Sequence, residues 1–113
     1  MTRNFDLILT IVNKGFAEQA MEAAKKAGAQ GGTIISARGS GIHEAERFFG
    51  FSIQPEKDIV LILIKHQEKS AIMKAITQGA GLTTEGKGLS FSLPVDDVAG
   101  IVHMMSETKE IEP

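Results

Sequence analysis

The spacing of apolar and polar positions along the chain predicts four strands. Residues 5–12 (FDLILTIV) and 58–64 (DIVLILI) are short apolar runs rich in β-branched residues, and such runs are typical of strands. Residues 33–37 (TIISA) have the same composition over a shorter length. Residues 89–93 (LSFSL) alternate apolar with small polar residues, which predicts a strand with one buried side.

Helical spacing of apolar residues predicts three helices, two inside the set of strands and one after it. In the first, residues 14–28, one face carries Phe16, Ala20, Ala24 and Ala27, and Gly28 ends the helix. The second ends near Gly79 and has a face formed by Ala71, Ile72, Ala75 and Ile76. The third follows Pro94, with Asp96 as its cap and an inward face of Val98, Ile101, Val102 and Met105.

The resulting order, β-α-β-β-α-β plus a terminal helix, is the split βαβ pattern of ferredoxin-like folds. We therefore predict an α+β fold in a single domain, residues 1–113: a four-stranded antiparallel sheet, both core helices on one face, and an extra C-terminal helix. Residues 58–64 are apolar on both sides, although a sheet covered on one side should carry polar residues on the other. This pattern favours an oligomer; the alternative is that the terminal helix folds back over the open face.

Composition narrows the classes of function. The net charge of −2 gives no electrostatic footprint for nucleic acid, so we expect no nucleic-acid partner. The absence of cysteine excludes disulfides and thiol chemistry and fits a reducing cytoplasm. The apolar run near the N-terminus is too short to span a bilayer, so we expect a cytoplasmic protein without direct membrane insertion.

A glycine-rich segment, residues 81–88 (GLTTEGKG), has most of the spacing of a phosphate-binding P-loop. A P-loop follows a strand and opens a helix, whereas this segment follows a predicted helix and precedes a strand. Gly88 also stands where a hydroxyl would bind magnesium, so the chain is not a P-loop NTPase. Gly86 and Gly88 can still let the backbone approach an anion that Lys87 neutralises; a plain glycine turn is the alternative.

A second glycine segment, residues 31–41 (GGTIISARGSG), strengthens the phosphate interpretation. Gly39, Ser40 and Gly41 follow a predicted strand, where a nest of backbone amides can hold phosphate, and Arg38 can add a forked donor. The loop after the second strand and the loop before the fourth need not meet within one chain. The two loops could meet across an interface between neighbouring subunits.

Together the two glycine segments resemble the PII signalling family over nearly the whole chain. The resemblance implies a homotrimer that binds ADP or ATP in clefts between neighbouring subunits. It places Thr33 near the adenine, residues 38–57 in a long T-loop, with its irregular part at 42–54, and residues 81–88 in a phosphate-binding B-loop. The nucleotide-binding residues that it implies are Thr33, Arg38, Gly39, Ser40, Gly41, Thr84, Glu85, Gly86, Lys87 and Gly88.

Departures from the family pattern limit what the resemblance implies. The chain has no tyrosine, so uridylylation of a T-loop tyrosine is excluded. The arginines that family members direct to the γ-phosphate are missing from residues 95–105, and Glu56 and Asp58 flank Lys57. We therefore expect a preference for ADP, or poor discrimination between ADP and ATP, with the role of Mg²⁺ left open. The resemblance does not extend to 2-oxoglutarate, because that pocket needs a T-loop glutamine and His43 stands nearby.

The predicted T-loop also suggests a partner surface. Phe48, Phe49 and Phe51 are large apolar residues on a long polar segment, which indicates a contact surface for a regulated protein; the alternative is that they tuck against the chain's own strands. Ligand binding at the loop root would then change how these residues are displayed. Because several PII-like proteins regulate transporters, a membrane transporter is the candidate partner.

We predict a regulator, not an enzyme, with no catalytic residues and no catalytic cofactor. The chain has no cysteine, no GxSxG motif and no histidine beside a predicted carboxylate on rigid structure. His43, Glu44 and Glu46 form a weak ligand set on a loop, so we predict no metal site. The alternative function is a trimeric ferredoxin-like protein that binds another small ligand, such as cyclic di-AMP, or a metal ion.

Overall fold

The computed structural model describes residues 4–39, 46–48, 51–53, 55–84 and 87–100, with 46–48 and 51–53 described by their backbone alone. The elements of the main body are β1 (Phe5–Asn13), α1 (Ala17–Lys26), β2 (Thr33–Arg38), β5 (Glu56–Lys65), α2 (Lys69–Gly79) and β6 (Gly88–Val95). A 3₁₀ turn, His66–Glu68, leads from β5 into α2.

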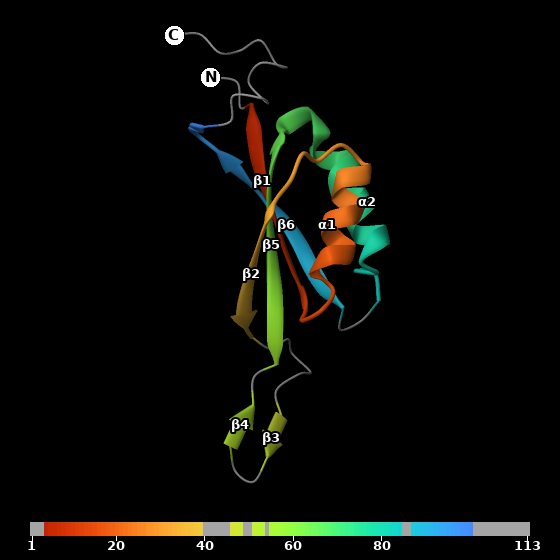
Figure 1. Cartoon of the computed structure of the whole chain (residues 1–113), viewed down its shortest axis with the longest axis vertical. Coiled ribbons are helices and arrows are strands. Elements are labelled where there is room, and N and C mark those ends of the chain that lie inside the picture. The colour runs from red at the N-terminus through yellow and green to blue at the C-terminus, as the bar shows by residue number, and fades with distance from the viewer. Residues whose placement is uncertain (1–3, 40–45, 49–50, 54, 85–86, 101–113) are drawn as a thin grey trace.

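The four long strands form one antiparallel sheet in the order β2-β5-β1-β6, and α1 and α2 lie together on one of its faces (Figure 1). The order and the one-sided placement of the helices confirm the predicted α+β, ferredoxin-like architecture. The strands continue one or two residues beyond most of the predicted limits, because backbone pairing extends past the apolar runs.

The core lies between the helices and the face of the sheet that they cover. Alternate residues of β1 and β5 point to this side and are fully buried, as the period of a strand requires. Its members are Ile8, Val12, Ala17, Ala20, Ala24, Ala29, Val60, Ile62, Ile64, Ile72, Ile76 and Ala80. The helices approach closely where Gly79 meets Ala23, since a Cβ added to Gly79 would lie 2.5 Å from the Ala23 Cβ.

The other face of the sheet, here called the open face, carries continuous apolar rows. Across the strands, Leu9 lies between Leu61 and Phe91. The row beside it joins Ile35, Ile59, Ile11 and Leu89, and a third row joins Leu63, Leu7 and Leu93. No described helix covers these rows, and Leu89, Phe91 and Leu93 are 52%, 38% and 44% exposed.

Strand β6 turns its apolar side toward the open face. Its Ser90 faces the helices, as its hydrogen bond with the buried Thr10 shows, so Leu89 and Phe91 face the other way. The strand was predicted correctly, but the buried side expected for it is not buried in the single subunit, where its apolar residues are exposed. Its apolar side packs against neither helix.

Three predictions about the helices are wrong. Ala71 does not belong to the buried face of α2: it is exposed, and the buried residues of that helix are Ile72 and Ile76. Phe16 is not in the core of α1: it immediately precedes the helix, is 38% exposed, and leaves the buried face to Ala17, Ala20 and Ala24. The terminal helix is not formed over residues 96–100, where Gly100 has a φ of +85°, outside the range of a right-handed helix. The remainder of that predicted helix lies outside the described residues.

The predicted T-loop is more regular than its sequence indicates. Glu46–Phe48 (β3) and Phe51–Ile53 (β4) pair as an antiparallel hairpin, with Phe48 opposite Phe51. In Figure 1 this hairpin projects beyond the end of the sheet, away from both helices. Phe49 lies outside the described residues. The stretch therefore contains short strands that its irregular polarity did not predict.

Candidate functional site

The described ends of the two glycine segments, Arg38–Gly39 and Lys87–Gly88, lie at the same end of the sheet but at its opposite edges. At that end Arg38 of β2 pairs with Glu56 of β5, and Gly88 of β6 pairs with Val12 of β1. Strands β5 and β1 separate the two edges, a distance of about 14 Å at ordinary strand spacing. Within one subunit the described residues of the two segments therefore do not form a single pocket.

The B-loop begins where α2 ends and is organised by short backbone contacts. Gly81 takes a left-handed φ of +68°, and its carbonyl oxygen accepts a hydrogen bond from the Thr84 amide at 3.0 Å. The Lys87 amide donates to the Thr84 carbonyl oxygen at 3.3 Å. Glu85 and Gly86, both predicted to bind the ligand, lie outside the described residues.

Gly88 has a structural reason to be glycine. Its φ is +137°, and an added Cβ would overlap the carbonyl oxygen of Ile11 on the neighbouring strand. No serine or threonine could therefore complete a P-loop here without displacing β6 from β1. The structure explains Gly88 by packing, whereas its predicted contact with phosphate stays a prediction.

Lys87 is the exposed cation of the B-loop. Its Nζ lies over the ring of Phe16, 5.2 Å from the ring centroid, a separation at which a cation is attracted to the face of an aromatic ring. Sequence analysis missed this contact because it assigned Phe16 to the core of the first helix. The residues are far apart in sequence, so no local spacing would have signalled it.

Strand β2 carries the other half of the predicted site. Thr33 and Arg38 stand at its two ends and are exposed, and they point to opposite faces because they are an odd number of residues apart. The Gly39 amide donates to the Pro55 carbonyl oxygen at 3.2 Å and closes the root of the predicted T-loop. Ser40 and Gly41 lie outside the described residues.

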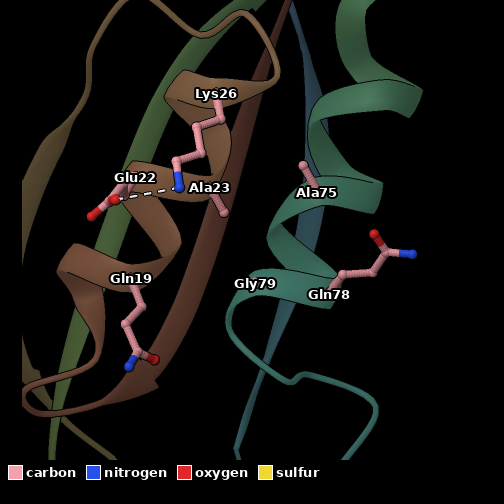
Figure 2. Close-up of a pocket in the computed structure, with 7 residues that line it drawn as sticks. All are labelled: Gln19, Glu22, Ala23, Lys26, Ala75, Gln78 and Gly79. Atoms are coloured by element: carbon pink, nitrogen blue, oxygen red, sulfur yellow. Dashed lines mark ion pairs between the residues drawn. The ribbon is translucent and has the colours of Figure 1, made fainter.

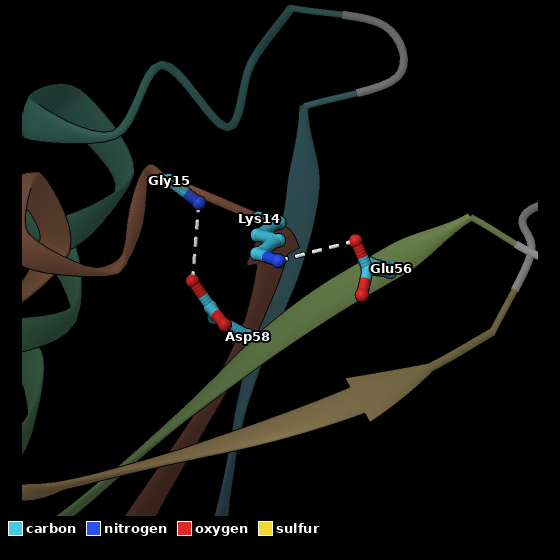
Figure 3. A network of polar contacts seen from close by, with 4 residues as sticks. All are labelled: Lys14, Gly15, Glu56 and Asp58. Carbon is cyan, nitrogen blue, oxygen red and sulfur yellow. Dashed lines mark hydrogen bonds and ion pairs between the residues drawn. The ribbon is translucent and has the colours of Figure 1, made fainter.

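A network of polar contacts joins the turn after β1 to the start of β5 (Figure 3). The Lys14 Nζ lies 3.2 Å from Glu56 Oε2, and the Gly15 amide donates to Asp58 Oδ2 at 3.1 Å. The Lys57 ammonium, largely buried, donates to Asn13 Oδ1 at 2.6 Å. Glu56 and Asp58 thus fasten this turn to the sheet, a role that their positions beside Lys57 in the sequence did not suggest.

Other polar features lie away from the glycine segments. A shallow groove of about 550 Å³ runs between the helices (Figure 2), and none of the predicted site residues lines it. Its lining residues are Gln19, Glu22, Ala23, Lys26, Ala75, Gln78 and Gly79. At the other end of the sheet, His66 Nδ1 lies 2.6 Å from Oδ2 of the buried Asp6.

The described residues contain neither a membrane-spanning helix nor a cluster of metal ligands. None of their helices is long and apolar enough to cross a bilayer. Their His, Asp and Glu side chains form no cluster of three or more that could hold a metal ion. His43 and Glu44, considered above as ligands, lie outside those residues.

The chain is similar to a known family and to solved structures of that family. The family model for nitrogen regulatory protein P-II matches residues 5–103. The crystal structure of Arabidopsis thaliana PII bound to citrate is similar to the chain, with a TM-score of 0.70 and 27% sequence identity. That similarity covers 88% of this chain and 85% of the plant chain. None of the curated proteins compared with the sequence matches it significantly.

Proposed function

The chain belongs to the nitrogen regulatory protein P-II family, and from this premise we propose that it is a signalling protein that binds adenine nucleotides between subunits. One observation carries the proposal: Arg38–Gly39 of one glycine segment and Lys87–Gly88 of the other lie at one end of the sheet and at opposite edges of it. A ring of subunits can bring the β2 edge of one copy beside the β6 edge of the next. Each cleft would then take its T-loop root from one subunit and its B-loop from the neighbour.

The open face supports the assembly that this arrangement needs. Ten apolar side chains form three rows on it, and those of β6 are among the most exposed apolar side chains described. Covering such a surface removes apolar area from water, and a further copy of the chain carries the same surface. We therefore propose a homotrimer, the assembly that the family resemblance implies.

The number of cations available at the proposed cleft favours a ligand with few phosphate groups. Lys87 is exposed and has no acidic partner among the described residues, and the Arg38 guanidinium likewise makes no ion pair with any of them. Lys14, by contrast, is paired with Glu56. Two available cations suit a diphosphate better than a triphosphate, so we propose that ADP binds more tightly than ATP. The plant relative, whose structure contains the small anion citrate, is compatible with an anion site in this fold.

In this proposal the T-loop communicates ligand binding to a regulated protein. The β3–β4 hairpin stands clear of the main body in Figure 1, so it is accessible to another protein. We propose that Phe48, Phe49 and Phe51 contact a regulated protein, with the cytoplasmic side of a membrane transporter as the candidate. In this proposal the protein is a cytoplasmic regulator without catalytic activity, and cyclic di-AMP or a metal ion is the alternative ligand.

Isothermal titration of the purified protein tests the proposal, with ADP, ATP plus magnesium, and cyclic di-AMP as ligands. We expect ADP to bind, and Lys87→Ala to weaken it by about 10- to 150-fold, the loss of one charge-assisted hydrogen bond. Lys25→Ala is the matched control: it removes an exposed lysine at the far end of α1, about 14 Å along the helix axis from Phe16, and should leave binding unchanged. ATP binding equal to or tighter than ADP binding would refute the preference, and no adenine-nucleotide binding would refute the proposed function.

A further inference from the structure

The contact between Phe16 and Lys87 joins the turn before α1 to the B-loop. Phe16 is a large apolar residue left 38% exposed, and the Lys87 ammonium lies over its ring. An aromatic ring has a negative face, so it attracts a cation without neutralising it as a carboxylate would. A lysine held in this way has no carboxylate partner at the contact among the described residues, so its ammonium group can still donate to an anion.

The ring is fixed in place by the turn that carries it. The Phe16 amide donates to the Asn13 carbonyl oxygen at 3.1 Å, and Gly15 supplies the left-handed φ of +96° that the turn requires. Two contacts with β5 hold the same turn: the Lys14–Glu56 ion pair and the hydrogen bond from the Gly15 amide to Asp58 (Figure 3). The platform under Lys87 is therefore attached to the sheet and not only to the flanking loop.

The backbone of Lys87 is also held on both sides. Its own amide bonds to Thr84, and the next residue, Gly88, packs directly on the backbone of β1. The backbone contacts do not fix the long side chain of Lys87. This side chain must lose rotamer freedom when it holds an anion. A ring that already restricts the ammonium reduces that cost, as preorganisation does in general.

We propose that Phe16 is a positioning residue that holds the Lys87 ammonium ready for the phosphate of the ligand. The proposal rests on the proposed function, because it assigns to Phe16 a share of the affinity that Lys87 provides. The contribution of Phe16 to ligand affinity follows from the strength of an exposed cation–π contact. Loss of that contact should weaken ligand binding by about 2- to 5-fold, less than removal of Lys87 itself.

Two variants separate positioning from packing. Phe16→Leu keeps a large apolar side chain but removes the π face, whereas Phe16→Tyr keeps the ring. The first measurement needs no nucleotide: in the ligand-free protein, the ε-methylene protons of Lys87 should show an upfield ring-current shift by NMR. We expect this shift in the wild type and in Phe16→Tyr, and its loss in Phe16→Leu. No shift in the wild type would overturn the proposal.

The second measurement is ADP titration of the same proteins. We expect Phe16→Leu to bind about 2- to 5-fold more weakly and Phe16→Tyr to bind like the wild type. In a Lys87→Met background, Phe16→Leu should have no further effect, since the cation is already absent. If the wild type binds ADP and Phe16→Leu binds equally well, the positioning role is wrong while the nucleotide site stands. If the wild type shows the ring-current shift but binds no ADP, the proposed function fails, and the positioning role fails with it.

Discussion

The two faces of the sheet are made by the same strands and have different surroundings. On the covered face, Ile8, Val60 and Ile62 have no exposed surface, because α1 and α2 close over them. On the open face, the neighbouring residues along the same strands, such as Leu9 and Leu61, are half-buried by their neighbours in the sheet alone. Equal hydrophobicity on the two faces of a strand thus indicates two packing partners, of which the chain itself supplies one.

Strand β6 makes the contrast sharper, because its large residues avoid the helices. Ser90 and Ser92 occupy the covered side, while Leu89, Phe91 and Leu93 occupy the open side. A strand that served only the core of one subunit would have the reverse arrangement. The open face therefore has the composition of a buried surface, which is the strongest support in one subunit for association with further copies.

The largest expected effect contrasts two adjacent residues of β5. Ile62→Ala on the covered face should lower the free energy of unfolding by about 2–5 kcal/mol, since it opens a cavity among fully buried side chains. Leu61→Ala on the open face should act mainly through association, so its effect should grow with protein concentration. Chemical denaturation over a hundredfold range of concentration measures both. A concentration-independent loss of the same size in both variants would contradict the distinction between the faces.

A charge on the open face tests the association directly. Phe91→Asp would bury a carboxylate without a partner in an interface, and we expect a loss of at least about 2 kcal/mol of association free energy, as for other central aromatic residues. Sedimentation velocity should show smaller particles, with the helical circular dichroism retained. Ala71→Asp, which adds the same charge on the exposed surface of α2, is the control and should sediment like the wild type. An unchanged sedimentation coefficient for Phe91→Asp would remove the open face as an interface.

The contrast between the two faces also explains which parts of the fold the sequence predicts and which it does not. Apolar periodicity located all four long strands and both core helices, because burial imposes that period on them. It could not decide which side of residues 89–93 faces the helices, since alternation carries no direction. Phe16 was misplaced because α1 begins at Ala17, three residues after the predicted start at residue 14, which leaves Phe16 at the cap and not on the buried face. The β3–β4 pairing has no alternating pattern, and Gly100 ends the possibility of a continuous helix over residues 96–100.

The sequence marks the candidate site by its glycines and its lysine, and ligand binding by these residues stays a prediction. Gly81 and Gly88 do take backbone conformations that favour glycine, so their positions carried real conformational information. The contacts that organise the site join segments distant in the chain: Phe16 with Lys87, and Lys14 with Glu56. Such contacts depend on strand order and register, which a single sequence does not specify residue by residue.

The smallest expected effect concerns the polar side of β6. Ser90 Oγ and Thr10 Oγ1 lie 2.9 Å apart, and Thr10 is completely buried, so Ser90→Ala would leave a buried hydroxyl without this hydrogen bond. We expect the free energy of unfolding to fall by about 1 kcal/mol.

Ser92→Ala is the matched control. Ser92 lies on the same strand and the same side, and its side chain makes no hydrogen bond with the described residues. Thermal and chemical denaturation of the two variants at one protein concentration provide the measurement. A clear loss in Ser90→Ala alone would establish that Ser90 faces the helices in the folded subunit, and hence that the neighbouring Leu89 and Phe91 face the other way. Equal stability of the two variants would mean that the covered side of β6 contributes nothing specific, and the inverted pattern of this strand would lose its significance.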